Sequence, residues 1–508
     1  MYDLKKVLFI KNALILTLTA LILRLAGIIF KVWLSNTVGS EGIGLYQLTF
    51  SVYVLFSTFA TGGISTAVTR LCADELSIGS GRGAIRILKK GIALSLIISM
   101  FSLLITFFGA DFIAGRLLSD MRVAPAIKIL GFSLPFMGVS SCLRGYFAAR
   151  RRTVSSSLSQ VLEQAARITI VMLLSSAFSS RGLSFACAAV LFGDTAAEAL
   201  SFAFIYFSFL LDRRKIKNVG EKPLPHGMRK IISIAAPITS GRYLNSALRT
   251  VENIAVPKSL ALYGGSSAAS LSQFGMIKGM ALPLIFFPSS FLGSVSMLLI
   301  PEMSEALSLR QQYKIRYIAE KVINLTFLSS FLLAGLFFTL SEPLGMLIYK
   351  SREVSFLLRA LAPLVPLMYI DSVCDGMLKG LDKQGFVFRL SVFDSALRIL
   401  LVVLLVPSMG MLGFLLIMMI SNALTGIWRV IKVVRLAEMP FLLTKWVIKP
   451  FCFAVFACAP TAFICSHLPL GALGTTLFSC ALSGTIFFYL AFRGGCLSRD
   501  DLRDLIKK

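Results

Sequence analysis

Two arginines inside long apolar segments are the residues of this chain best suited to binding an anion. Arg24 lies in ALILRLAGIIF, and no acidic residue occurs between Asn12 and Ser35 to neutralise it. Arg249 lies in NSALRTVENIAV, three residues before Glu252. A guanidinium presents a planar fork that matches phosphate oxygens. We therefore expect these arginines to bind a phosphate or diphosphate, with Glu252 neutralising Arg249 in its absence. The alternative is that each arginine pairs with an acid from another helix.

A second set of charges pairs an acid with an arginine at helical spacing. Glu163 and Arg167 are four residues apart in SQVLEQAARI, and Asp394 and Arg398 take the same places in LSVFDSALRI. An acid at i with a base at i+4 is the favourable orientation for an ion pair on a helix. The pairs either tie helices together or bind substrate or a coupling ion. Three further carboxylates in apolar segments have the same two interpretations: Asp194, Asp371 and Asp375.

Covalent catalysis is not indicated by any motif in the chain. The two histidines, His226 and His467, stand apart from any HExxH pattern, and there is no GxxxxGK[ST] loop or hydrolase triad. Without a phosphate-binding loop the chain is not expected to hydrolyse ATP. We expect no enzyme, no catalytic residue, no metal site and no cofactor. Energy would come from an Na⁺ or H⁺ gradient or from the membrane potential.

The elements that must position these charges are membrane-spanning helices. Of 508 residues, 56% are hydrophobic and 15% are charged, against roughly 25% charged in a soluble domain. Since a helix crosses a bilayer with about 20 apolar residues, the sequence predicts an all-α polytopic membrane protein with about fourteen spans. The expected spans are 10–34, 45–69, 90–109, 127–147, 158–178, 185–211, 231–257, 273–300, 318–340, 356–378, 389–406, 411–432, 446–466 and 470–492.

The distribution of basic residues orients these spans. The net charge of +26 could indicate a nucleic-acid ligand, but about 35 of the 51 Lys and Arg fall in loops on the side of the N-terminus. Because cytoplasmic loops are enriched in Lys and Arg, both termini are predicted to be cytoplasmic, in a bacterial cell membrane. The basic loops would then face anionic lipid headgroups, and we expect no nucleic-acid partner.

An internal repeat divides the spans into two lobes. Residues 135–168 align with 366–399 without a gap, and the matches include Pro135 with Pro366 and Arg167 with Arg398. Chance similarity between apolar helices is the alternative. Six spans is an even number, so the two copies would share one orientation, with a substrate path between them. The predicted parts are an N-terminal lobe (1–211), a basic cytoplasmic linker (212–230), a C-terminal lobe (231–434), and two further spans with a cytoplasmic tail (435–508).

Four stretches resemble the stage V sporulation protein B family of the multidrug/oligosaccharidyl-lipid/polysaccharide (MOP) exporter superfamily. They are SSCLRGYFAARRRTVSSSLSQVLEQAARI (140–168), LRLAGIIFKVWLSNTVGSEGIGLYQ (23–47), TGGISTAVTRLCADE (61–75) and NSALRTVENIAVPKSL (245–260). The resemblance covers essentially the whole chain. It implies a V-shaped pair of six-helix lobes with two extra helices, working by alternating access.

The related lipid II flippases supply a pattern for the arginines. They carry an arginine in the first span, which Arg24 matches, and an Arg-x-x-Glu in the seventh, which Arg249 and Glu252 match. They also place an arginine within the second span, whereas this chain has none there before Arg70. Because this arginine is missing, the resemblance does not specify the headgroup of the substrate.

Three functions follow as hypotheses. The first is a flippase for an undecaprenyl-diphosphate-linked sugar, either a peptidoglycan precursor such as lipid II or a polysaccharide repeat unit, with sporulation as a setting. The second is a cation-coupled multidrug antiporter, which would need an acidic cavity. The third is a membrane scaffold for wall synthesis. For the first we expect a lipid-linked glycan substrate, cell-wall synthesis proteins as partners, and a functional monomer.

Overall fold

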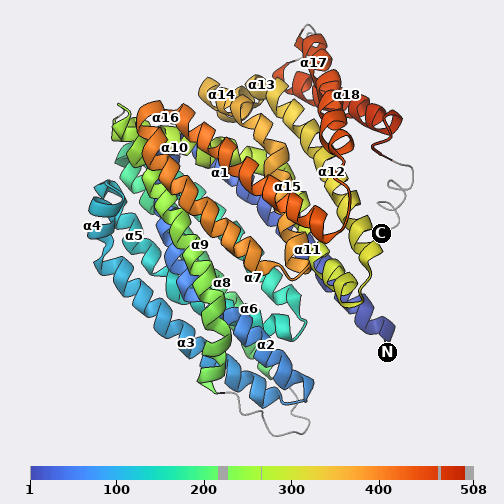
Figure 1. The fold of residues 1–508 in the computed structure, drawn as a ribbon. Coiled ribbons are helices and arrows are strands. Elements are labelled where there is room, and N and C mark those ends of the chain that lie inside the picture. Colours follow the sequence, from blue (N-terminus) through green and yellow to red (C-terminus); the bar gives the residue numbers. More distant parts are fainter. Residues whose placement is uncertain (1, 215–226, 265, 467–470, 498–508) are drawn as a thin grey trace. The chain divides into compact units, whose positions relative to one another are not determined.

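The computed structural model describes residues 2–214, 227–264, 266–466 and 471–497 (Figure 1). Nearly all of these residues are helical, and no strand occurs in these ranges. The prediction of an all-α polytopic protein is confirmed. The longer elements are α1 (Tyr2–Thr61), α2 (Ile64–Ser77), α3 (Gly81–Phe108), α5 (Ala124–Gly131), α6 (Ser133–Ala149), α7 (Thr153–Leu174), α8 (Phe178–Arg213), α9 (Met228–Leu262), α10 (Ser267–Phe274), α11 (Leu282–Ser308), α12 (Gln312–Thr339), α13 (Ser341–Tyr349), α14 (Arg352–Leu361), α15 (Val365–Gly380), α16 (Gln384–Leu436), α17 (Lys449–Ser466) and α18 (Ala472–Arg493).

Short helices join some of these elements. They are α4 (Ala110–Phe112), three π-helical turns, η1 (Ile113–Leu117), η4 (Gly275–Ala281) and η6 (Thr444–Ile448), and three 3₁₀ turns, η2 (Met121–Val123), η3 (Ser175–Ala177) and η5 (Ala362–Leu364).

Each predicted span coincides with a helix or a run of joined helices. By length and composition, nine of the described segments could cross a membrane, or ten with the pair Met121–Gly131 and Ser133–Ala149, which is bent by 40°. The number is below fourteen partly because Gln384–Leu436 contains two predicted spans and Thr19–Ser77 contains one and most of another. Two polar-rich helices, α7 and α9, are also outside the nine. The chain is a multi-pass membrane protein, and fourteen spans stays a prediction.

Glycines separate paired spans inside the longest helices. Gly39 in α1 has φ 73° and Gly410 in α16 has φ 57°, both in the left-handed region that side chains disfavour. Gly182 in α8 has φ 77°. Each glycine lies between two predicted spans, so the chain turns there without a long loop.

The described chain divides into two compact units. Unit 1 comprises Met1–Lys258 with Ser266–Gly275, and unit 2 comprises Ser259–Gly265 with Met276–Lys508. Most of α9, the first helix of the predicted C-terminal lobe, therefore belongs to unit 1, where Thr250 donates a hydrogen bond to the Ser51 carbonyl at 3.0 Å. The predicted lobe boundaries are not tested by this division and stay a prediction.

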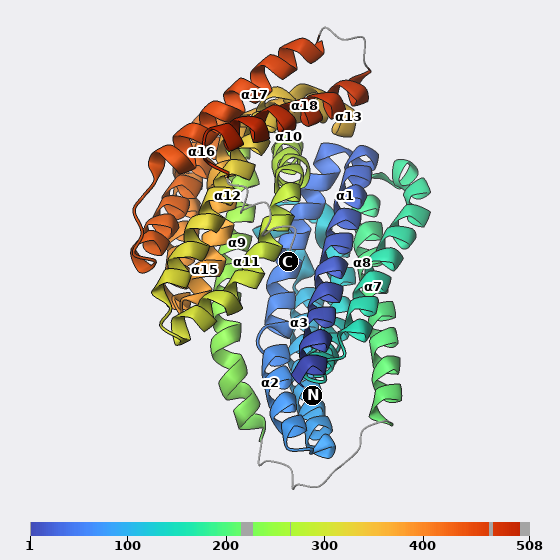
Figure 2. The ribbon, with the colours of Figure 1, turned by 90° about the vertical axis from the view of Figure 1, so that its right-hand side faces the viewer.

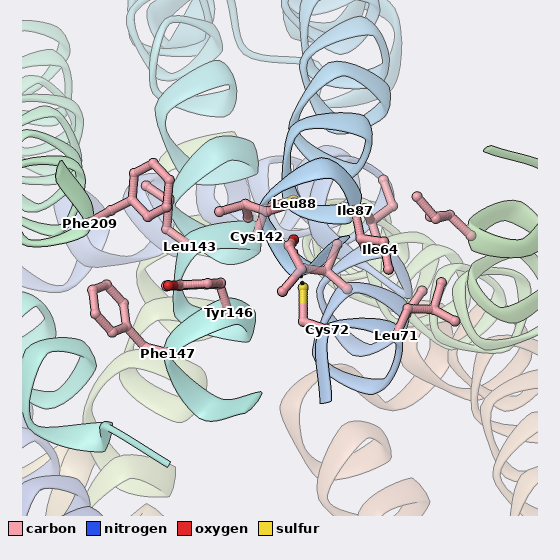
Figure 3. Close-up of a cluster of buried hydrophobic side chains, with 14 of the residues drawn as sticks. Ile64, Leu71, Cys72, Ile87, Leu88, Cys142, Leu143, Tyr146, Phe147 and Phe209 are labelled. Atoms are coloured by element: carbon pink, nitrogen blue, oxygen red, sulfur yellow. Dashed lines mark hydrogen bonds between the residues drawn. The ribbon is translucent and has the colours of Figure 1, made fainter. Parts of the chain in front are cut away.

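The core of unit 1 joins α2, α3, α6 and α8. Figure 3 shows side chains from these helices meeting in one apolar cluster, with Leu71 and Cys72 from α2, Leu88 from α3, and Tyr146 and Phe209 from α6 and α8. All five side chains are buried. This cluster fixes α6 and α8 relative to one another, and both helices carry charges of the candidate site.

Unit 2 has a second core built on its last two helices. Helices α17 and α18 lie side by side and pack against α12 (Figures 1 and 2). Leu328 of α12, Cys458 of α17 and Phe487 of α18 are buried in this cluster. The two final helices are therefore an integral part of unit 2.

Candidate functional site

The two predicted anion-binding arginines are exposed on different helices of unit 1. Arg24 lies on α1 and Arg249 on α9, and neither forms an ion pair with a side chain that the structure describes. Glu252, one turn after Arg249, is 6% exposed. A charge facing lipid at mid-bilayer costs about 2.5–3.5 kcal/mol, so an aqueous cavity is the favourable surrounding for such arginines. That these three residues bind a diphosphate stays a prediction.

A charge network lies within unit 1, at the meeting of α6, α7 and α8. On α7, Arg167 lies 3.2 Å from Glu163. Arg144 of α6 donates to the second Glu163 oxygen at 2.9 Å, and Arg167 Nε lies 2.5 Å from the Oδ1 atom of Asp194 on α8. The side chain of Glu198, one turn after Asp194, lies within hydrogen-bonding reach of Glu163. The acid–arginine pair is thus the centre of a group of five charges.

Small residues allow the three helices to approach closely enough for this network. A Cβ on Gly193 of α8 would lie 2.5 Å from the Val171 side chain of α7. Ser201 of α8 accepts a hydrogen bond from Arg144 at 3.0 Å and donates one to the Ser159 carbonyl of α7 at 3.1 Å. Small residues at helix interfaces permit close packing in membranes. The network therefore depends on backbone proximity as well as on charge.

Unit 2 holds a related network at the meeting of α15 and α16. Arg398 lies 3.1 Å from Asp394, and the hydroxyl of Ser421 is hydrogen-bonded to both side chains. Arg429 Nη1 lies 2.6 Å from Asp371 Oδ2. Two predicted acids therefore face arginines from the two arms of α16. Asp375, one turn after Asp371, is paired with Lys379.

The two networks occupy matching places in the repeat. Helix α7 begins at Thr153 and α16 at Gln384, 231 residues later, and this interval relates Arg144 to Asp375. The breaks at Gly182 and Gly410 are 228 residues apart. The stretch from the start of α16 to its break is therefore three residues shorter than the stretch from the start of α7 to the break in α8. The 3₁₀ turn η3 has that length.

Beyond the glycine breaks, the interval of 228 residues relates three positions of α8 to α16. Asp194 corresponds to Asn422, Glu198 to Gly426 and Ser201 to Arg429, and all six residues are buried. In each copy one arginine joins the fourth span to the sixth. In unit 1 it is Arg144, on the fourth span, and in unit 2 it is Arg429, on the sixth. Neither Asp194 nor Glu198 has a charged counterpart.

Two buried charged residues, Arg429 and Asp212, were not among the site residues predicted from the sequence. Arg429 lies three residues before the end of the predicted span 411–432 and is not among the charges singled out from the sequence. The small or polar residues Ser421, Asn422 and Thr425 recur on the same helix face and could have placed Arg429 on its buried side. Asp212, at the end of α8, is buried and accepts hydrogen bonds from Tyr146 at 2.8 Å and from Arg152 at 2.5 Å.

Known proteins are similar to this chain in sequence and in fold. Residues 9–307, more than half of the chain, match the model of a family described as polysaccharide biosynthesis protein. Stage V sporulation protein B of Bacillus subtilis (strain 168) is 24% identical over 503 residues, or 97% of each chain. Lipid II flippase MurJ of the same strain is 22% identical over 532 residues, or 96% of each chain.

A solved structure of lipid II flippase MurJ in an inward closed conformation has the same fold, with a TM-score of 0.70 at 16% identity, over 96% of this chain and 99% of that chain. The resemblance drawn from the sequence motifs is confirmed. The chain belongs to the polysaccharide biosynthesis protein family.

Proposed function

We propose that this protein is a flippase that moves an undecaprenyl-diphosphate-linked sugar, such as lipid II or a polysaccharide repeat unit, across the bacterial cytoplasmic membrane by alternating access. The observation that carries the proposal is the pair of exposed arginines on two long helices of a multi-pass membrane protein, Arg24 on α1 and Arg249 on α9, in a chain similar over 96% of its length to a protein named lipid II flippase.

The chemistry of the two arginines fits a diphosphate. Its oxygens can accept bidentate hydrogen bonds from a guanidinium, and the strength of those bonds depends on exclusion of water. Arg249 is exposed on α9, and Asn253, one turn further along the same side of that helix, donates to the Ser51 hydroxyl of α1 at 2.9 Å. Energy for net movement would come from an ion gradient, from the membrane potential or from consumption of the product.

Translocation of labelled lipid II in proteoliposomes tests the proposal. We expect transport by the wild type and loss of transport in Arg249→Ala, because the diphosphate loses its cationic ligand. Arg389→Ala is the matched control, since Arg389 is an exposed arginine at the start of α16 and its removal costs the same charge. Helical content and elution in detergent establish that both variants are folded.

The outcomes separate substrate from site. Equal transport by folded Arg249→Ala and wild type would remove the arginine site. Absence of lipid II transport by all three proteins, with retained binding of another polyprenyl-diphosphate glycolipid, would keep the flippase and replace lipid II as its substrate. Drug sensitivity of a deletion strain without any transport of a polyprenyl glycolipid would favour the multidrug antiporter instead.

A further inference from the structure

The charges buried in unit 1 do not balance. Two guanidinium groups, Arg144 and Arg167, lie among three carboxyl groups, Glu163, Asp194 and Glu198. With every group ionised, the network carries one negative charge more than it has positive charges to match. An unmatched charge inside a bundle of apolar helices is strongly disfavoured. One carboxyl group must therefore be neutral or must hold a cation.

Glu198 is the carboxyl group on which the excess falls. It is 3% exposed, and its Oε2 atom has no hydrogen-bond partner among the described residues. The oxygens of Asp194 also have no such partner, but Asp194 is ion-paired with Arg167, whereas Glu198 forms no ion pair with a described residue. Its side chain also lies within hydrogen-bonding reach of that of Glu163. Two ionised carboxylates have only acceptors and repel each other, so side chains this close are stable together when one of them carries a proton that the other accepts. The contact and the charge imbalance lead to the same requirement.

The surroundings of Glu198 supply no further cation. Arg144 is engaged by Glu163 and Ser201, and Arg167 by Glu163 and Asp194. The titratable and charged groups that face Glu198 or Asp194 from the packed helices are Arg144 of α6, Glu163 and Arg167 of α7, and Tyr46 and Tyr53 of α1. Arg122, on the neighbouring turn η2, is already paired with Asp120 and Glu41.

Unit 2 shows the same architecture without the imbalance. Its network contains three carboxylates, Asp371, Asp375 and Asp394, and three cations, Lys379, Arg398 and Arg429. The positions that correspond to Asp194 and Glu198 are the uncharged residues Asn422 and Gly426. The requirement for an added cation is therefore specific to unit 1.

We propose that unit 1 binds one proton between the carboxyl groups of Glu163 and Glu198. In the described chain no group of three or more His, Cys, Asp or Glu side chains is arranged to hold a metal ion, and a proton needs no coordination shell. Binding of the proton requires no substrate. Its use as a coupling ion rests on the flippase function proposed above, since release of the proton would return a negative charge to the network.

Infrared spectroscopy of the full chain in lipid vesicles, without substrate, tests the site. A protonated carboxyl group absorbs as a carbonyl band that shifts in D₂O. We expect this band at neutral pH in the wild type and its reduction in Glu198→Gln, because the remaining two acids are matched by two arginines. Glu163→Gln is expected to give the same reduction, which guards against a folding defect in either variant alone.

Asp394→Asn is the matched control, because Asp394 occupies the place of Glu163 in the repeat. It should leave the band unchanged. A band that persists in both glutamine variants, or that is absent from the wild type, would overturn the proton site. Loss of the band on adding Na⁺ at constant pH would also overturn it, in favour of a metal cation.

The measurement is independent of the flippase test. A normal band with no glycolipid transport would remove the flippase and keep the proton site. Transport that is sensitive to Arg249→Ala, with no band, would remove the proton site and keep the flippase.

Discussion

At the scale of single residues, burial determines which charges are needed for stability. Arg429 is 7% exposed and lies 2.6 Å from Asp371, so removing it leaves a carboxylate without its main partner. Arg429→Met is expected to lower the free energy of unfolding by about 3–5 kcal/mol, measured by denaturant unfolding in detergent. The double variant with Asp371→Asn should recover much of the loss, because both charges are then gone.

An exposed pair of the same kind provides the contrast. Lys128 and Asp111 lie 3.0 Å apart with side chains 37% and 60% exposed. Lys128→Met is expected to change the free energy of unfolding by no more than about 1 kcal/mol, since solvent screens the pair. If the two methionine variants were equally destabilised, burial would not be the cause.

Local spacing made part of the candidate site predictable at this scale. The helical interval of four residues brings Glu163 to 3.2 Å from Arg167 and Asp394 to 3.1 Å from Arg398. The partners from other helices, Arg144 and Arg429, could not be assigned in the same way, because helix packing rather than sequence spacing brings them in. Whether these charges bind a ligand stays a prediction.

At the scale of helices, glycines set where a continuous helix turns into two spans. A Cβ on Gly410, at φ 57°, would lie 2.7 Å from the ring of Tyr263. Gly410→Ala therefore combines backbone strain with a steric clash, and we expect a loss of about 1–3 kcal/mol in unfolding free energy from the backbone alone. Thermal unfolding in detergent measures the effect.

Gly484→Ala is the control for the substitution itself. Gly484 lies within α18, and its added Cβ would meet no heavy atom within 4 Å. Alanine is the better helix former by roughly 1 kcal/mol, so this variant should be as stable as the wild type or more so. A loss of stability in Gly484→Ala similar to that in Gly410→Ala would rule out a special role for the turn.

The predicted spans coincide with helices of the structure, but apolar runs did not predict how those helices are joined. Hydropathy reports the length and burial of an element, whereas the joints depend on single backbone angles. In the sequence, Gly39 and Gly410 look like any glycine inside a helix. The three-residue turn η3 matches the three extra residues of the first copy of the repeat, and hydropathy alone does not locate those residues.

At the scale of the whole molecule, the unequal distribution of basic residues predicts the orientation in the membrane. An alkaline phosphatase reporter fused after Ser119 should be active outside the cytoplasm, and one fused after Arg214, at the start of the basic linker, should be inactive. The opposite pattern would reverse the predicted placement of both termini. Expression of each fusion, checked by immunoblot, is the control.

The internal repeat was visible in the sequence, but the grouping of helices into compact units was not. An ungapped alignment identifies equivalent positions, and the charge networks of α7 and α16 lie at such positions. Which helices pack most closely depends on summed contacts among many apolar side chains, and these place most of α9 in unit 1. Sequence similarity between copies carries no information on that choice.

The different placement of the arginine in the two copies also bears on their history. If both copies descend from one gene, an arginine was gained on one span and lost from another, and the two events had an order. Losing the arginine first would have left the acids of the ancestral bundle without their partner. Gaining the second arginine first would have been harmless in a copy with an excess of acid, such as the one that now holds Arg144 with Glu163 and Glu198. Whichever copy changed, an intermediate that held both arginines would have kept the buried acids partnered throughout.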